Sequence, residues 1–158
     1  MIYLENIDPG NWRLNLKVAD HQKGYVSDRV TMLARAYAYR DSRSRAFVIY
    51  DDETPVGMAM YHDCEDMDAY DLSQLFIDER YQGRGYGKTA TQIVLDMMRQ
   101  EGTYEKVVLC YIEGNVAAKK MYEGFGFREC DRDEDEIVME LSLKELGDCH
   151  TSVRTGSR

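Results

Sequence analysis

Short apolar runs bounded by polar or turn residues recur along the chain and predict strands. The polar stretch from Asp51 to Pro55 separates two of these runs and predicts a hairpin turn, so those strands are expected to be antiparallel neighbours. The run at 107–112 is continuous, which is typical of a central strand buried on both faces. The expected strands cover residues 46–50, 56–61, 70–77, 107–112, 127–130 and 137–143.

A second pattern, with apolar residues three or four apart, predicts four helices. The first is a short helix at about 11–18, and the second, at about 27–39, is described below. The third follows a glycine-rich stretch and ends near Gly102. Asn115 is placed to cap a fourth, which ends near Gly124. The second helix, at about 27–39, is expected to be amphipathic. Its apolar face is formed by Val26, Val30, Leu33, Ala34 and Tyr37, which fall at helical spacing.

The order strand, helix, strand between 70 and 112 predicts a right-handed crossover. The glycine-rich stretch 82–88 then lies at the carboxyl end of its strand, where open α/β sheets bind ligands. Alternating glycines let several backbone N–H groups converge, and a helix N-terminus attracts anions. We therefore expect this loop to bind a pyrophosphate.

Two common phosphate motifs do not fit this loop. A dinucleotide fingerprint needs a glycine where Lys88 stands, and a Walker A loop needs one more residue between Gly83 and Gly87. The loop does resemble the acetyl-CoA loop of the GCN5-related N-acetyltransferases (GNAT), through Gln82, Gly85 and Gly87. The stretch 115–122 followed by Gly124-Phe-Gly-Phe resembles the second motif of that family.

The resemblance covers about residues 1–143 and implies a mixed α/β GNAT fold. This fold has a central, mostly antiparallel sheet of about seven strands, splayed between two parallel strands and flanked by about four helices. We expect a single domain at 1–143 and a disordered tail at 144–158, which has no apolar period. At 158 residues, one core suffices.

Composition limits the classes of binding partner and the cellular compartment that we expect. A formal net charge of -9 argues against binding nucleic acid or anionic lipid and suits a cationic partner. No apolar run reaches membrane-spanning length and no secretory signal opens the chain, so a cytoplasmic protein is expected. The four cysteines are widely spaced, which predicts reduced thiols and no metal site. Members of the family are often dimers, so the resemblance leaves a homodimer open.

The resemblance also implies how acetyl-CoA is held. The backbone around 75–77 would pair with the pantetheine arm, and the glycine loop would hold the pyrophosphate, with positive charge from two basic side chains. Side chains at 75–77 are expected to belong to the core. The residues assigned to the cosubstrate are Leu75, Phe76, Ile77, Gln82, Gly83, Arg84, Gly85, Tyr86, Gly87, Lys88, Asn115 and Lys119.

Acetyl transfer to an amine needs a neutral nitrogen and a proton for the departing thiolate. The family assigns the proton donor to the motif position that Tyr122 occupies. For the base, Asp71 is a candidate that acts through water, and Ser73 can relay a proton. Polyamine-acetylating relatives can carry a carboxylate where Ser73 stands, so the sequence departs from them. A covalent route through Cys110 is not expected, because buried thiols in apolar strands are inert.

Five carboxylates fall within the nine residues 63–71 without a basic residue, which favours an ammonium-bearing acceptor. The amino-terminal segment resembles bacterial spermine/spermidine acetyltransferases. A polyamine is therefore the expected acceptor; a protein N-terminus, a lysine or an aminoglycoside stays open, as does a non-catalytic acyl-CoA sensor. The residues expected to contact the acceptor are Trp12, Asp20, Tyr25, Asp28, Glu65 and Asp66.

Overall fold

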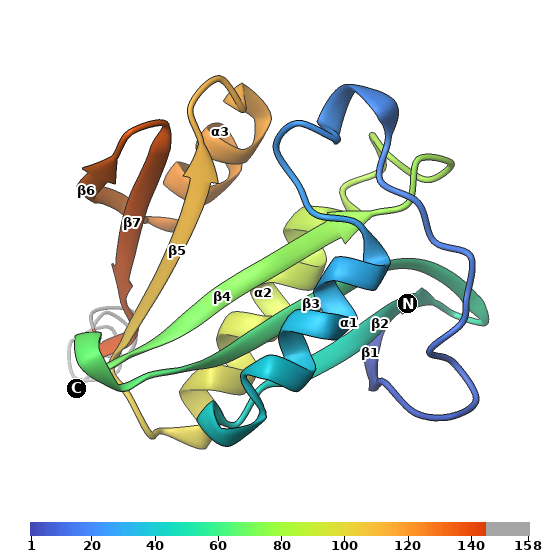
Figure 1. The fold of residues 1–158 in the computed structure, drawn as a ribbon, viewed down its shortest axis with the longest axis horizontal. Coiled ribbons are helices and arrows are strands. Elements are labelled where there is room, and N and C mark those ends of the chain that lie inside the picture. Colours follow the sequence, from blue (N-terminus) through green and yellow to red (C-terminus); the bar gives the residue numbers. More distant parts are fainter. Residues whose placement is uncertain (145–158) are drawn as a thin grey trace, which may run out of the picture. The chain divides into compact units, whose positions relative to one another are not determined.

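A computed structural model describes residues 1–144, which form both strands and helices (Figure 1). Within this range there are seven strands and three α-helices, where about four helices were expected. Three short 3₁₀ helices are η1 (Asp20–Gln22), η2 (Arg40–Ser42) and η3 (Glu65–Met67). The strands and α-helices are β1 (Ile2–Asn6), α1 (Arg29–Ala38), β2 (Arg45–Asp51), β3 (Thr54–Cys64), β4 (Ala69–Ile77), α2 (Tyr86–Glu101), β5 (Lys106–Ile112), α3 (Val116–Phe125), β6 (Arg128–Asp133) and β7 (Glu136–Ser142).

The chain divides into two compact units. Unit 1 comprises residues 1–63 and 71–94, and unit 2 comprises residues 64–70 together with the chain from Leu95 onward. The single domain expected at 1–143 stays a prediction, and so does the splay between parallel strands, since β4 and β5 fall in different units. The tail expected to be disordered lies, apart from Lys144, outside the described residues. No helix in residues 1–144 has the length and apolar character needed to cross a membrane.

Unit 1 contains the sheet β1-β2-β3-β4. The predicted hairpin is confirmed, because β2 and β3 pair antiparallel and close with Asp51 opposite Thr54. Asp52 takes a left-handed φ of 53° in the turn, a conformation that Asp tolerates better than most residues. β1 was not among the predicted strands. It pairs with β2, and Tyr3 stacks on Tyr50 at 5.3 Å between ring centroids.

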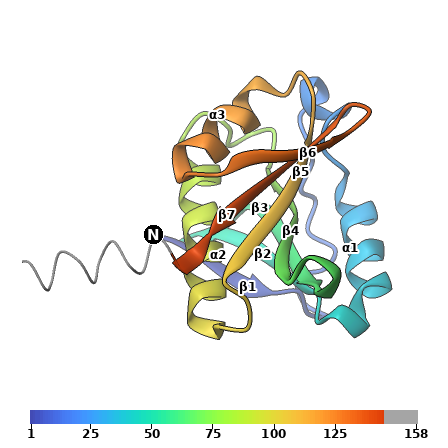
Figure 2. The same cartoon turned by 90° about the vertical axis from the view of Figure 1, so that its left-hand side faces the viewer.

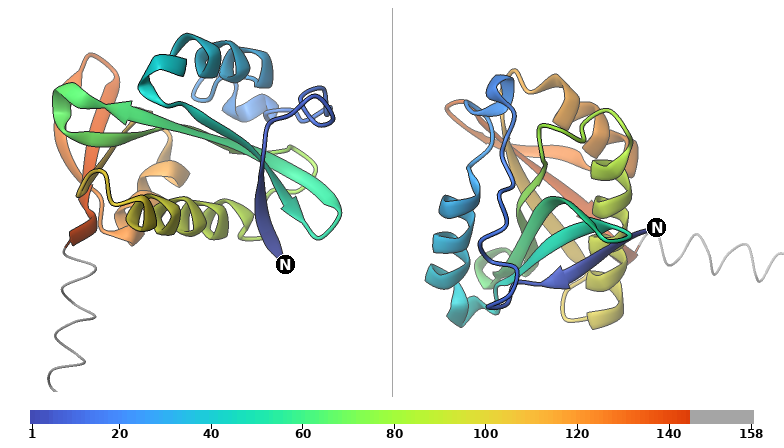
Figure 3. Two further views of the ribbon diagram at one scale, coloured as in Figure 1. Left: turned by 90° about the horizontal axis from the view of Figure 1, so that it is seen from below. Right: turned by 90° about the vertical axis from the view of Figure 1, so that its right-hand side faces the viewer.

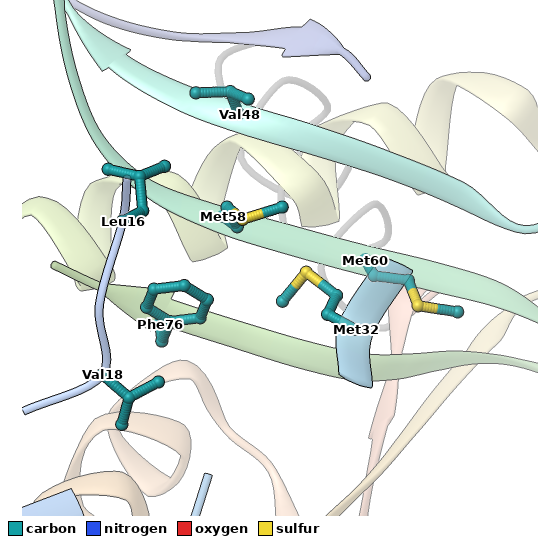
Figure 4. Packing of buried hydrophobic residues seen from close by; sticks show 7 residues of the cluster. All are labelled: Leu16, Val18, Met32, Val48, Met58, Met60 and Phe76. Carbon is teal, nitrogen blue, oxygen red and sulfur yellow. The ribbon is translucent and has the colours of Figure 1, made fainter. Parts of the chain in front are cut away.

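Helix α1 covers one face of this sheet, and the part of α2 within unit 1 covers the other (Figure 3). The apolar face predicted for this helix was wrong in part. Val30 and Tyr37 are exposed and Met32 is fully buried, whereas Val26 and Leu33 pack against the core as expected. The unbranched Met32 side chain fills the space above the strands, where its partners come from three elements (Figure 4). The buried cluster consists of Leu16, Val18, Met32, Val48, Met58, Met60 and Phe76.

The helix expected at 11–18 is absent, and this prediction was wrong. The stretch forms turns and then runs extended, with Leu16 and Val18 buried two residues apart, the period of an extended chain. Asn11 does not continue a helix, because its amide donates to the carbonyl of Asn6 and its Oδ1 accepts from the backbone of Asp8.

Unit 2 carries the antiparallel strands in the order β5-β7-β6, with β6 at an edge (Figure 2). β5 and β7 match the expected strands closely. All side chains of β6 are exposed, and a register irregularity lies between Glu129 and Asp131. The expectation that Cys110 is buried was wrong. Its neighbours Leu109 and Tyr111 take the buried face of β5, so the thiol stands on the other face and is exposed.

Candidate active site

The glycine loop has the backbone expected of an anion cradle. Gly83 and Gly85 have left-handed φ values of 77° and 81°, and a Cβ at either would meet no atom within 4 Å. Thr89 N–H donates to the carbonyl of Gly85 at 3.1 Å, which closes the first turn of α2. The N–H groups before Thr89 in that turn have no acceptor within the helix. The main chain at these two glycines is therefore open to solvent, as binding of an anion would require.

Two side chains assigned to the cosubstrate make hydrogen bonds within unit 1, to which the loop itself belongs. The amide of Gln82 donates to Gln22 Oε1 at 2.6 Å and to the carbonyl of Ile77 at 3.2 Å. The hydroxyl of Tyr86 donates to Asp51 Oδ2 at 2.6 Å. These contacts fix the position of the loop within unit 1. Arg84 and Lys88 are exposed, as groups that add charge to a bound phosphate must be.

The end of β4 is anchored by a buried carboxylate that directly follows it. Asp78 is 1% exposed and accepts hydrogen bonds from the backbone of Lys17 at 2.8 Å and from Arg80 Nε at 2.8 Å. Burial favours a higher pKa for Asp78, but the bonds from Arg80 and Lys17 outweigh it and the pKa lies below its usual value. Phe76 and Ile77 are buried and Leu75 is half-buried, so their side chains belong largely to the core, as expected.

The base candidates lie earlier on β4. Asp71 and Ser73 are both half-buried. Asp71 Oδ2 lies 3.8 Å from Nε2 of the buried His62 on β3. Burial raises the pKa of Asp71, although His62 and Arg35 act in the opposite direction.

The acidic stretch 63–71 is less uniform than its sequence implies. Asp63 is buried and bound by Arg43 Nε at 2.6 Å and by Arg45 at 3.1 Å, so it is already neutralised and unsuited to an ammonium group. Glu65 and Asp66 lie in η3, in unit 2, and are exposed. Asp63 is therefore not available to bind an ammonium group, whereas Glu65 and Asp66 are open to solvent.

A pocket of about 790 Å³ opens in unit 1 between the segment 15–31 and the residue that follows Asp78. Asp20 and Asp28, two of the residues assigned to the acceptor, line it, and so does Glu79. Asp28 also caps α1 by accepting from Thr31 N–H at 2.8 Å. The pocket wall does not include Trp12 or Tyr25, which are exposed on the surface. Its basic wall residues are Lys17, Lys23 and Arg29, and Lys23 pairs with Asp20 at 2.7 Å.

The second motif forms α3 in unit 2. Asn115 is its N-cap and accepts from Ala118 N–H at 3.3 Å, as predicted. Tyr122 is buried and meets Phe127 edge-on, with ring centroids 5.7 Å apart. Burial raises the pKa of Tyr122 to about 12, so its hydroxyl keeps its proton at neutral pH. Lys119 is exposed and lies 3.9 Å from Glu123, one turn further along the helix.

A family model described as the acetyltransferase (GNAT) family matches residues 12–127 of the chain. The chain belongs to this acetyltransferase family. Spermine/spermidine N(1)-acetyltransferase of Bacillus subtilis is 28% identical to this acetyltransferase over 121 residues, which cover 73% of the chain and 78% of that protein.

Solved structures share the fold of this acetyltransferase. Spermidine N-acetyltransferase from Vibrio cholerae in complex with CoA and spermine is 20% identical, with a TM-score of 0.73 over 90% of this chain and 96% of that one. Ribosomal-protein-S18-alanine N-acetyltransferase from Escherichia coli is 18% identical, with a TM-score of 0.70 over 90% and 94% of the two chains. The expected mixed α/β GNAT fold is confirmed.

Sequence reasoning missed two residues of this acetyltransferase, His62 and Asp78. A signal for His62 exists: it lies three residues before Glu65, and Asp71 lies three residues after Asp68, so a hairpin centred on 65–68 sets them opposite each other. Asp78 has no comparable signal, because its partner Lys17 donates through the main chain. Among residues 1–144 we find no group of His, Cys, Asp or Glu side chains arranged to hold a metal ion.

Proposed function

We propose that this acetyltransferase moves the acetyl group of acetyl-CoA to a primary amine of a polyamine such as spermidine or spermine. The similarity to the Bacillus subtilis spermine/spermidine acetyltransferase carries the choice of acceptor, since the match covers most of both proteins. The pocket in unit 1 supports it through its size, which is large enough for an extended amine, and through the carboxylates of Asp28 and Glu79 in its wall, since Asp20 already pairs with Lys23.

The glycine loop supports acetyl-CoA as the donor. Its main chain offers N–H groups beside open space at Gly83 and Gly85, and the exposed Arg84 and Lys88 supply positive charge. The related structure from Vibrio cholerae was solved with CoA. When bound, acetyl-CoA supplies an activated thioester, and the protein has to orient it and manage two protons.

The first proton belongs to the acceptor. An alkyl ammonium has a pKa near 10.4, so a neutral amine at pH 7 costs about 4 to 5 kcal/mol. A carboxylate near the reacting nitrogen attracts the ammonium and draws its proton away through water. Asp71 is proposed for this role, because it is half-buried and burial raises its pKa. Ser73, two residues along the same strand, can relay the proton.

The second proton goes to the leaving thiolate. Tyr122 is proposed as the donor, because its hydroxyl stays protonated in its buried site. The neutral amine attacks the thioester carbonyl directly. As the C–N bond forms and the C–S bond breaks, the nitrogen releases its extra proton to water and the thiolate sulfur takes the Tyr122 proton. The tyrosine recovers a proton from solvent after the products leave.

An acceptor screen tests this function. Acetyl-CoA turnover is measured with spermidine, spermine, a lysine peptide, an N-terminal alanine peptide and an aminoglycoside, and products are identified by mass spectrometry. We expect the highest kcat/KM with a polyamine. Equal rates for spermidine and the lysine peptide would refute the polyamine assignment, and CoA binding without turnover of any amine would indicate a sensor.

A further inference from the structure

His62 and Asp71 form a pair on neighbouring strands of unit 1. The His62 side chain is 7% exposed and that of Asp71 is 31% exposed, with Nε2 and Oδ2 separated by 3.8 Å. At this distance the two groups attract when the imidazole is protonated, and a small shift brings them into hydrogen-bond range. One partner is therefore open to water while the other is shielded from it.

The orientation of the imidazole ring is set by the main chain. Nδ1 of His62 lies 2.8 Å from the carbonyl oxygen of Asp63. A carbonyl oxygen only accepts, so Nδ1 carries the hydrogen, and in the neutral ring Nε2 holds the free lone pair. The atom that faces Asp71 is thus the one that can take up a proton.

The neighbours of His62 hold the ring without competing for Nε2. Tyr39 stacks on it, with centroids 4.3 Å apart and planes 12° from parallel. The carboxylate of Asp63 is bound by Arg43 and Arg45, so its charge is already balanced. Arg35 of α1 is the further charge near Asp71 and lowers the pKa of that carboxyl.

We propose that His62 acts through Asp71 as the terminal proton acceptor for the acceptor amine. This inference rests on the proposed function and deepens it. The proton leaves the ammonium nitrogen for a water molecule, passes to the Asp71 carboxylate and ends on Nε2 of His62. The ring becomes an imidazolium paired with Asp71 and later releases its proton to solvent. His62 does not touch the substrate, so it is a positioning and proton-storing residue.

Distances along β4 agree with a path through water. Asp71 precedes Leu75 by four residues, about 13 Å along a strand, and Ser73 lies midway. A carboxylate that far from the proposed pantetheine-pairing stretch cannot reach a thioester directly. It can receive a proton from the reacting nitrogen through a chain of waters, with Ser73 as a relay midway.

The test uses His62→Asn, because an asparagine amide can still donate to the Asp63 carbonyl but has no group in place of Nε2. At pH 7 we expect kcat/KM for spermidine to fall about 10²-fold. The deficit should shrink toward zero near pH 10, where free amine exists in solution. His21→Asn, at an exposed histidine, should match the wild type across the whole pH range.

A deficit that is equal at all pH values would overturn the proposal, since it would indicate a packing defect only. Full activity of His62→Asn at pH 7 would overturn it as well. Asp71→Asn adds a second readout: the double variant should be about as slow as the slower single variant, because both changes break one path. Failure of the proposed function looks different, since the wild type itself would then not turn over polyamines.

Discussion

Gly57 lies so close to Phe76 that a Cβ on the glycine would stand 2.3 Å from the Phe76 carbonyl oxygen. This contact joins β3 to the end of β4, where the main chain of 75–77 is proposed to meet acetyl-CoA. Because the obstructing atom is backbone, it cannot move aside as a flexible side chain can. We expect Gly57→Ala to lower the free energy of unfolding by about 1 to 3 kcal/mol.

Urea denaturation measures this change, with Gly24→Ala as the matched control. A Cβ at Gly24 meets no atom within 4 Å, so that variant should stay within about 0.5 kcal/mol of the wild type. An unchanged urea midpoint for Gly57→Ala would contradict the close approach of the two strands.

Asp63 balances the charge of two arginines, so Asp63→Asn should destabilise the protein. Arg45 is only 17% exposed and would lose the charge-assisted bond that Asp63 accepts from it. Arg43 is half-exposed and water compensates it in part, so we expect a loss of about 2 to 3 kcal/mol. Thermal or urea unfolding of Asp63→Asn beside the exposed-site variant Asp41→Asn measures it. Equal stability of these two variants would show that the ion pairs contribute nothing.

Asp78 makes stability depend on pH in the acid range. Its folded pKa lies below that of the unfolded chain, so its contribution is complete above about pH 4 and is lost as pH falls through the folded value. Asp78→Asn should lower stability at pH 7 and reduce the slope of stability against pH below about pH 4. Urea unfolding at several pH values gives both slopes. If stability fell with decreasing pH by the same amount in the wild type and in Asp78→Asn, the lowered pKa of Asp78 would be contradicted.

Tyr122→Phe should slow chemistry without weakening CoA binding. Removing a general acid typically costs about 10²-fold or more in kcat. Phenylalanine keeps the edge-on contact with Phe127, so the fold should be unaffected. Calorimetric titration with CoA and steady-state kinetics separate the two effects, and Tyr37→Phe at an exposed site of α1 serves as the control. Loss of CoA affinity in Tyr122→Phe would point to a structural role instead.

Asp28→Asn removes a charge from the pocket but keeps a side chain that caps a helix well. If the pocket takes the polyamine, KM for spermidine should rise several-fold while kcat and the melting temperature change little. The increase should be smaller at high salt, because the lost attraction is electrostatic. A KM that does not change would place the acceptor elsewhere.

The sequence predicted best those elements whose pattern is local. The continuous run of β5, the hairpin turn at Asp51 and the cap Asn115 each depend on neighbouring residues. Prediction failed where contacts with residues distant in sequence decide which side chains are buried or which conformation the backbone adopts. Spacing alone does not show that Met32 rather than Val30 faces the sheet, or that Leu16 and Val18 run extended beside the end of β4.

In the candidate site, too, local features could be predicted from the sequence, whereas features set by tertiary contacts could not. The turn geometry of Gly83 and Gly85 follows from glycine spacing and is present in the structure. The charge state of the acidic stretch does not follow from spacing, because Arg43 and Arg45 neutralise Asp63 from outside it. His62 looks like any buried strand residue until its ring is seen beside Asp71.

The edge strand β6 presents five charged side chains to water and none from the core. A strand from another molecule that tried to add to this edge would have to dehydrate those charges, and the irregularity at Glu129 would break its ladder. The charged edge strand β6 therefore disfavours fibril-like aggregation by strand addition at high protein concentration.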